Sequence, residues 1–220
     1  MGFILTNLLI RLFVKDHKNT SNVTVRERYG KFAGIVGIAS NFLLFVIKII
    51  AGTLFRSISI TADAVNNLTD SASSFITIIG FKISGKPADE KHPYGHARME
   101  YISGLIVTFI VSLLGVQLIQ SSAKKIINPV PGEFSIISII ILAVSIFIKL
   151  WQCLFYRKIG RIINSATLFA VSADSRNDTF STSAVLVAAV ISKLTGFDLD
   201  GYMGAVVAIL ILVSGIKLMN

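Results

Sequence analysis

Six apolar stretches, each long enough to cross a membrane as a helix, account for most of this 220-residue chain. A helix needs roughly 20 apolar residues to span the hydrocarbon core of a bilayer. Charged residues make up 15% of the sequence, whereas soluble domains average about 25%. The apolar stretches cover approximately residues 32–54, 57–83, 100–122, 134–156, 162–193 and 201–219. We therefore predict an all-α membrane protein with six transmembrane helices.

The first 31 residues differ from the rest of the chain. Residues 1–14 are mainly apolar with Arg11 among them, and a polar, charged stretch follows as far as Lys31. Such a segment is typical of an amphipathic helix that lies in the membrane interface. We predict two regions, a cytoplasmic or interfacial N-terminal segment over 1–31 and a six-helix transmembrane domain over 32–220.

The placement of Lys and Arg predicts the orientation of the chain. A net charge of +9 would suggest a nucleic-acid partner in a soluble protein, but in a membrane protein its distribution carries the information. With the N-terminus in the cytoplasm, fourteen of the 21 basic residues lie on the inner side. Four lie outside and three within the helices; the outer four are Arg56, Lys124, Lys125 and Lys193. Both termini are therefore predicted to be cytoplasmic, and no nucleic-acid partner is expected.

Acidic and amide side chains interrupt two of the apolar stretches at matching spacing. Asn66 and Asp70 lie in the second stretch, and Asp174 and Asp178 lie in the fifth. Residues four apart share one face of a helix, so two facing helices would direct four oxygen ligands to one point. Carboxylates within a membrane are energetically costly and usually functional. We predict a cation site formed by these four residues.

The types of ligand indicate which cation would bind. Amide and carboxylate oxygens suit hard divalent ions, whereas zinc favours imidazole and thiolate. Neither stretch contains His or Cys, and the single cysteine, Cys153, excludes a disulfide framework or a Cys-based zinc site. The sequence therefore predicts Mn²⁺ or Fe²⁺ as the bound ion.

Crowded carboxylates also predict a coupling to protons. Three of them in a low dielectric cannot all stay ionised without a cation, so some should bind protons when the site is empty. Metal binding would release those protons, because ligands must be deprotonated to coordinate. A site that holds either metal or protons, and opens to each side in turn, is a metal/proton antiporter.

Other polar residues admit two interpretations. Asp63 is either a gate or relay in the same cavity or a hydrogen-bonded structural residue. Asp89, His92 and His96 form either a second, superficial metal site or an ordinary charged turn.

Two lysines inside the apolar stretches have a simpler interpretation. We expect Lys48 and Lys149 to extend their ammonium groups toward the membrane surface.

Three motifs resemble the cation diffusion facilitators, a family of six-span divalent-metal exporters. The motifs are Ala62-Asp-Ala-Val-Asn-Asn-Leu-Thr-Asp70, His92-Pro-Tyr-Gly-His-Ala-Arg-Met-Glu100 and Ala173-Asp-x-x-x-Asp178. The resemblance extends from about Arg28 to the end of the sequence.

The resemblance implies that the second and fifth helices carry the transport site. Zinc-transporting members typically have His or Asp at the position of Asn66 and His at that of Asp174, whereas the manganese-exporting branch has Asn and Asp there. The resemblance also implies a homodimer. That expectation is weakened because the usual C-terminal cytoplasmic domain has no counterpart in this sequence.

Several alternatives remain open. A zinc exporter of the same family and a passive cation channel are both compatible with intramembrane carboxylates. An intramembrane aspartyl protease is disfavoured, because the Gly-x-Gly-Asp motif of such enzymes does not occur. We expect a non-enzymatic transporter in a lipid bilayer, without a cofactor, in a bacterial plasma membrane.

Overall fold

The computed structural model describes residues 2–14, 16, 23–84, 98–128 and 135–217. These residues form seven α-helices and no strand. In chain order the helices are α1 (Gly2–Phe13), α2 (Val23–Leu54), α3 (Ile58–Ser84), α4 (Arg98–Ile127), α5 (Ile136–Ile163), α6 (Ala166–Thr195) and α7 (Asp200–Lys217). The prediction of an all-helical chain is confirmed for this part of the molecule.

Helices α2–α7 coincide with the six predicted apolar stretches. The largest difference is at α2, which begins at Val23 rather than near residue 32. The residues added at its start include Arg26, Glu27, Arg28 and Lys31, all of which have good helix propensity and extend the helix beyond its apolar part. Helix α5 likewise runs to Ile163 and ends at Asn164, which has the left-handed conformation (φ 48°) common at helix ends.

By length and hydropathy alone, two helices within the described residues qualify as membrane spans. They are Arg28–Leu54 and Ile136–Ile163, each with a mean hydropathy of 2.2, and a shorter apolar segment covers Asp200–Val213. Helices α3 and α6 carry more polar side chains than these two spans. Six spans and two cytoplasmic termini therefore remain predictions.

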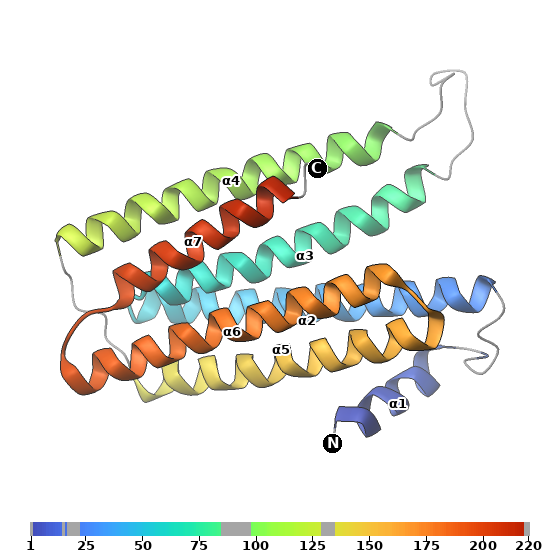
Figure 1. Ribbon diagram of the computed structural model, residues 1–220, viewed down its shortest axis with the longest axis horizontal. Helices are drawn as coiled ribbons and strands as arrows, with labels where there is room; N and C mark the ends of the chain where they lie inside the picture. Colours follow the sequence, from blue (N-terminus) through green and yellow to red (C-terminus); the bar gives the residue numbers. More distant parts are fainter. Residues whose placement is uncertain (1, 15, 17–22, 85–97, 129–134, 218–220) are drawn as a thin grey trace.

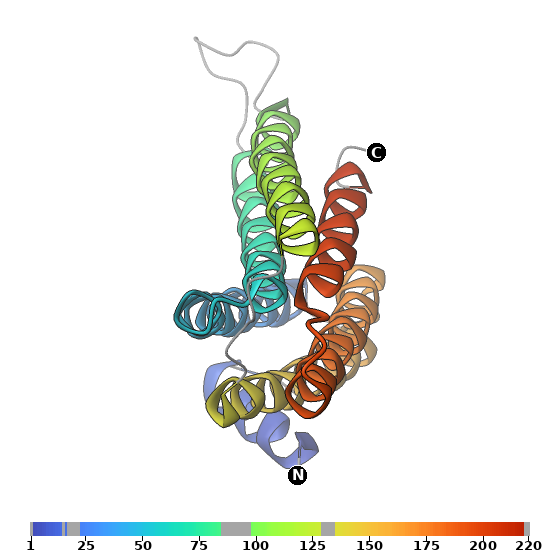
Figure 2. The same ribbon diagram turned by 90° about the vertical axis from the view of Figure 1, so that its left-hand side faces the viewer.

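The long helices form a bundle with two parts. Helices α3, α4 and α7 pack against one another, and α5 packs against α6. Helix α2 contacts both α3 and α5, and α6 contacts α7. The two parts are therefore joined through α2 and through the contact between α6 and α7. Figure 1 shows the long helices lying side by side, and the end-on view of Figure 2 separates α3, α4 and α7 from α5 and α6.

Helix α1 crosses one end of the bundle and packs against α5 (Figure 1). Ile10 of α1 and Val14, just after it, are buried against this end of the bundle, whereas Leu8, Leu12 and Phe13 are exposed. The segment is thus a helix with one buried face and exposed apolar side chains. Its position in the membrane interface remains a prediction.

Two apolar clusters form the core, one toward each end of the bundle. One consists of Ala51, Ile60, Ala62, Val65, Leu118, Leu142, Val185, Ala189, Val207, Ala208 and Ile211, from helices α2–α7. The other consists of Ile10, Val14, Val25, Tyr29, Ala33, Phe155, Tyr156, Ile159, Ile163 and Leu168. Along α5, Leu142 belongs to the first cluster and Phe155 to the second, so the middle of this helix lies between them.

A carboxylate at the start of α7 fixes the first turn of α3. Asp200 accepts hydrogen bonds from the backbone N–H groups of Ile58 (2.6 Å) and Ser59 (3.1 Å), and from the hydroxyl groups of Ser57 (2.6 Å) and Ser59. Lys125 Nζ of α4 lies 2.7 Å from Asp200 Oδ2. The first N–H groups of a helix lack partners within the helix, so Asp200 satisfies these donors and joins three helices.

Candidate metal centre

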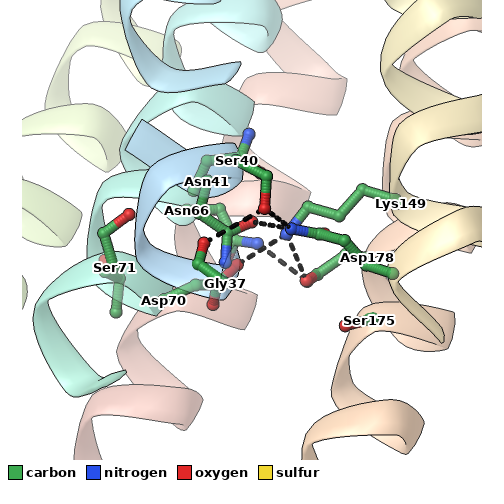
Figure 3. Close-up of polar contacts among 12 residues, drawn as sticks. Gly37, Ser40, Asn41, Asn66, Asp70, Ser71, Lys149, Ser175 and Asp178 are labelled. Atoms are coloured by element: carbon green, nitrogen blue, oxygen red, sulfur yellow. Dashed lines mark hydrogen bonds and ion pairs between the residues drawn. The ribbon is translucent and has the colours of Figure 1, made fainter. Parts of the chain in front are cut away.

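A polar cluster occupies the space between α3 on one side and α5 and α6 on the other. Asn66 and Asp70 come from α3, Lys149 from α5 and Asp178 from α6, each near the middle of its helix. Figure 3 shows Lys149 extending from α5 toward the carboxylates of Asp70 and Asp178. The cluster thus lies between the two apolar clusters of the core.

The ammonium group of Lys149 bridges the two carboxylates. Its Nζ lies 2.8 Å from an oxygen of Asp70 and 2.8 Å from an oxygen of Asp178. Asn66 completes the arrangement, because its Nδ2 donates a hydrogen bond of 2.9 Å to the other oxygen of Asp178. These polar side chains therefore connect α3 to α6.

The members of the cluster differ in exposure. The side chain of Lys149 is 1% exposed, whereas those of Asp70 and Asp178 are 28% and 16% exposed. The two carboxylates are thus partly accessible to the surroundings of the protein, whereas the side chain of Lys149 is buried. The expectation that Lys149 extends to the membrane surface is wrong, because two carboxylates on neighbouring helices satisfy its charge within the bundle.

The expectation is also wrong for Lys48. Its ammonium group is fully buried and lies 2.6 Å from a carboxylate oxygen of Asp63. Thr182 of α6 lies within hydrogen-bond distance of both oxygens of Asp63, at 3.0 and 3.1 Å, and donates its hydroxyl proton to this carboxylate. Asp63 is therefore a hydrogen-bonded, ion-paired residue, and a role as gate or relay remains a prediction.

The four predicted ligands are not all in one place. The structure brings together Asn66, Asp70 and Asp178, whereas Asp174 lies on an exposed face of α6, one turn before Asp178. Across the residues the structure describes, no group of three or more His, Cys, Asp or Glu side chains is close enough to hold a metal ion. The predicted loop site of Asp89, His92 and His96 lies outside the described residues.

Polar side chains of α2 and α5 lie next to the cluster. The amide nitrogen of Gln152, three residues after Lys149, donates to the hydroxyl of Ser40 and to Asn41 Oδ1 (3.3 Å). Gly37 of α2 lies against Tyr156 of α5, where a Cβ added at Gly37 would lie 1.9 Å from the hydroxyl oxygen. The absence of a side chain at Gly37 therefore permits the close approach of α2 and α5 beside the candidate site.

The chemistry of the cluster suits a hard cation. Two carboxylates and an amide meet there, and these groups offer oxygen ligands of the kind that Mn²⁺, Mg²⁺ and Ca²⁺ prefer. The position between the two carboxylates already holds a positive charge, that of Lys149. The arrangement therefore places oxygen ligands of this kind, paired with a lysine ammonium group, in the interior of a helical bundle.

The sequence predicts that Asn66, Asp70 and Asp178 lie together, but Lys149 is absent from the predicted site. A signal was present, since Lys149 lies at least seven residues, or about 10 Å of helix, from either end of its apolar stretch. Ionisable residues at that depth pair with one another, and Asp70 and Asp178 are acids expected at the same depth.

Comparison with known proteins shows the family of the chain. Residues 34–219 match the family model described as the cation efflux transmembrane domain. The manganese efflux system protein MneS of Bacillus subtilis is 33% identical over 190 residues, covering 84% of this chain and 66% of that protein. An uncharacterised transporter of Methanocaldococcus jannaschii is 33% identical over 177 residues, covering 80% of this chain and 62% of its own length.

The name of a third relative refers to cations in general and not to manganese. The cation-efflux pump FieF of Shewanella oneidensis is 26% identical over 178 residues, covering 81% of this chain and 60% of that protein. The chain thus spans less than two thirds of the length of these relatives. The family match covers most of the chain, and the matched residues include those of the polar cluster. The chain therefore belongs to the cation efflux family of integral membrane proteins, the cation diffusion facilitators.

Proposed function

We propose that this chain forms the transport site of a divalent-cation exporter, with Mn²⁺ as its preferred ion. The main support is the cluster of Asn66, Asp70 and Asp178, which offers oxygen ligands but no imidazole or thiolate. Oxygen ligands favour manganese over zinc. The similarity to a protein named for manganese efflux supports the same choice.

In this proposal Asp174 becomes the fourth ligand in the metal-bound state. It lies one turn from Asp178 on α6, so a small rotation or shift of α6 would bring it toward α3. Such a movement would also accompany alternating access, in which the bundle opens to one side and then to the other. The proposal includes a homodimer in a bacterial plasma membrane.

Proton exchange follows from the charges of the site. Asp70, Asp174 and Asp178 are three carboxylates on two neighbouring helices, and such groups cannot all stay ionised in a poorly solvated interior without a cation. A divalent ion that binds them would therefore displace protons, because carboxylate ligands must be deprotonated to coordinate a metal. The proposed mechanism is therefore an antiport of Mn²⁺ against protons.

Transport into proteoliposomes tests this function. Vesicles containing the purified protein receive an imposed pH gradient, and uptake of Mn²⁺ and Zn²⁺ is measured together with the lumenal pH. We expect Mn²⁺ uptake with opposing proton movement in the wild type, and none in the Asp70→Asn variant. The surface variant Asp16→Asn serves as the control and should transport normally, because Asp16 is exposed at the periphery, 3.6 Å from Arg28.

Other outcomes would contradict parts of the proposal. Cation flux without proton movement, driven only by the metal gradient, would indicate a channel. A dominant Zn²⁺ flux would show that ligand hardness does not set selectivity in this site. Unchanged Mn²⁺ transport by Asp70→Asn would exclude the site itself.

A further inference from the structure

Lys149 occupies the place where a cation bridging Asp70 and Asp178 would bind. We propose that Lys149 is a tethered competitor of the transported metal: its ammonium group fills the cation position in the empty site, and the metal ion must displace it. This inference rests on the proposed function of the site. It adds a residue that limits how tightly the metal is held.

The distances make joint occupancy unfavourable. The ammonium nitrogen lies 2.8 Å from each carboxylate, whereas a hard divalent ion of the size of Mg²⁺ or Ca²⁺ needs its oxygens at about 2.0–2.6 Å. A metal ion between the same two oxygens would therefore fall within a few ångströms of the ammonium group. Like charges at that separation repel strongly in a poorly solvated interior, so the metal and the lysine alternate.

The buried position of Lys149 distinguishes it from a surface lysine. With 1% of its side chain exposed, the ammonium group has no direct route to water. It therefore needs a second hydrogen-bond acceptor inside the bundle when the metal takes its place.

Gln152 provides such an acceptor. This residue is fully buried and lies three positions after Lys149, so the two side chains are neighbours on the surface of α5. Its Nε2 is bound to Ser40 and Asn41, whereas its Oε1 has no hydrogen-bond partner among the residues that the structure describes. Buried acceptors are rarely left unsatisfied. We assign Gln152 Oε1 as the acceptor of the displaced ammonium group.

This arrangement has a consequence for transport. An exporter must release its ion as well as bind it. The displaced ammonium group competes with the metal for Asp70 and Asp178, and this competition favours release. The lysine also keeps Asp70 and Asp178 paired when the metal has left, which stabilises the empty protein.

Metal binding to the purified protein in detergent tests the proposal. The Mn²⁺ dissociation constant is measured for the wild type and Lys149→Met, which retains an apolar chain but no charge. We expect Lys149→Met to bind Mn²⁺ at least about tenfold more tightly, the factor corresponding to one charge-assisted hydrogen bond. The same variant without metal should have a lower Tm, and Mn²⁺ should raise its Tm by more than it raises that of the wild type.

A control variant separates competition from general effects, and a second variant of Lys149 covers a failure to fold. Lys48→Met also removes a buried, ion-paired lysine, and it should lower the Tm while changing Mn²⁺ affinity far less than Lys149→Met does. If Lys149→Met fails to fold, Lys149→Gln replaces it, since this variant keeps a hydrogen-bond donor without the charge and should also bind more tightly.

The outcomes are distinct for the two proposals. Equal or weaker Mn²⁺ binding by a folded Lys149 variant would overturn the competitor role, because a structural lysine or a metal ligand would behave in that way. If the wild type binds no Mn²⁺, or if Asp70→Asn binds it equally well, the proposed function itself fails.

Discussion

Lys48 Nζ lies 2.6 Å from Asp63 Oδ2, and the two side chains are 0% and 2% exposed. This ion pair joins α2 to α3, and the hydroxyl of Thr182 extends it to α6. Asp63 lies two turns before Asp70 on the same helix, so a second lysine–carboxylate pair accompanies the one at the candidate metal centre. The two pairs together compensate charge along the interior of the bundle.

The first prediction concerns the stability of this buried pair. Lys48→Met leaves the Asp63 carboxylate without its main partner, which costs roughly 3–5 kcal/mol for a buried pair. We expect the Tm in detergent to fall by about 10 °C. The double variant Lys48→Met/Asp63→Leu should recover part of this loss, because both charges are then absent. A double variant less stable than Lys48→Met would contradict the assigned structural role.

The second prediction concerns Asp200. Asp200→Ala removes the acceptor of the first N–H groups of α3 and leaves buried Lys125 without its closest carboxylate. We expect a loss of roughly 3–5 kcal/mol. Asp198→Ala is the matched comparison, since Asp198 accepts a hydrogen bond from the backbone N–H of Asp200 and lies 3.9 Å from Lys125. Its loss should cost only about 1 kcal/mol. Equal shifts in Tm for the two variants would show that Asp200 does not anchor α3.

The third prediction concerns the metal preference of Asp174. Asp174→His adds an imidazole, a ligand that zinc favours over manganese. If Asp174 coordinates the transported ion, the ratio of Zn²⁺ to Mn²⁺ uptake into proteoliposomes should rise. Ala184→His, at an exposed position of α6 farther along the helix, should leave the ratio unchanged. An unaltered ratio in Asp174→His would argue that the exposed position of Asp174 persists when metal binds.

The fourth prediction concerns the contact between α2 and α5. Gly37→Ala places a methyl group on the hydroxyl of Tyr156, and overpacking of this kind costs typically about 1–3 kcal/mol. Tyr156→Phe removes the clashing oxygen, so the double variant should be more stable than Gly37→Ala alone. Thermal unfolding of the three variants measures the effect. Strict additivity of the two changes would show that Gly37 and Tyr156 do not meet.

The helices and most of the site could be predicted from the sequence for physical reasons. Apolar stretches of about 20 residues can only satisfy their backbone groups in a membrane as helices, and the observed helices follow those stretches. The spacing of Asn66 and Asp70 places them on one face of α3. Asp178 meets that face across the bundle, as its motif predicted.

The partners of the buried lysines could not be predicted in the same way. Which carboxylate pairs with Lys48 or Lys149 depends on how four helices pack, and periodicity within one helix does not determine this. Asp63 lies only three residues before Asn66 in α3, yet its carboxylate pairs with Lys48 of another helix, α2. The exposure of Asp174 likewise depends on the rotation of α6 relative to α3.

The most direct test of the account is the location of bound manganese. Diffraction data collected at the manganese absorption edge from crystals grown with Mn²⁺ would show the ion as an anomalous peak. We predict a peak between Asp70 and Asp178, within coordination distance of Asn66, with the ammonium group of Lys149 moved away from both carboxylates. A manganese ion bound only elsewhere, with Lys149 still between Asp70 and Asp178, would contradict the account.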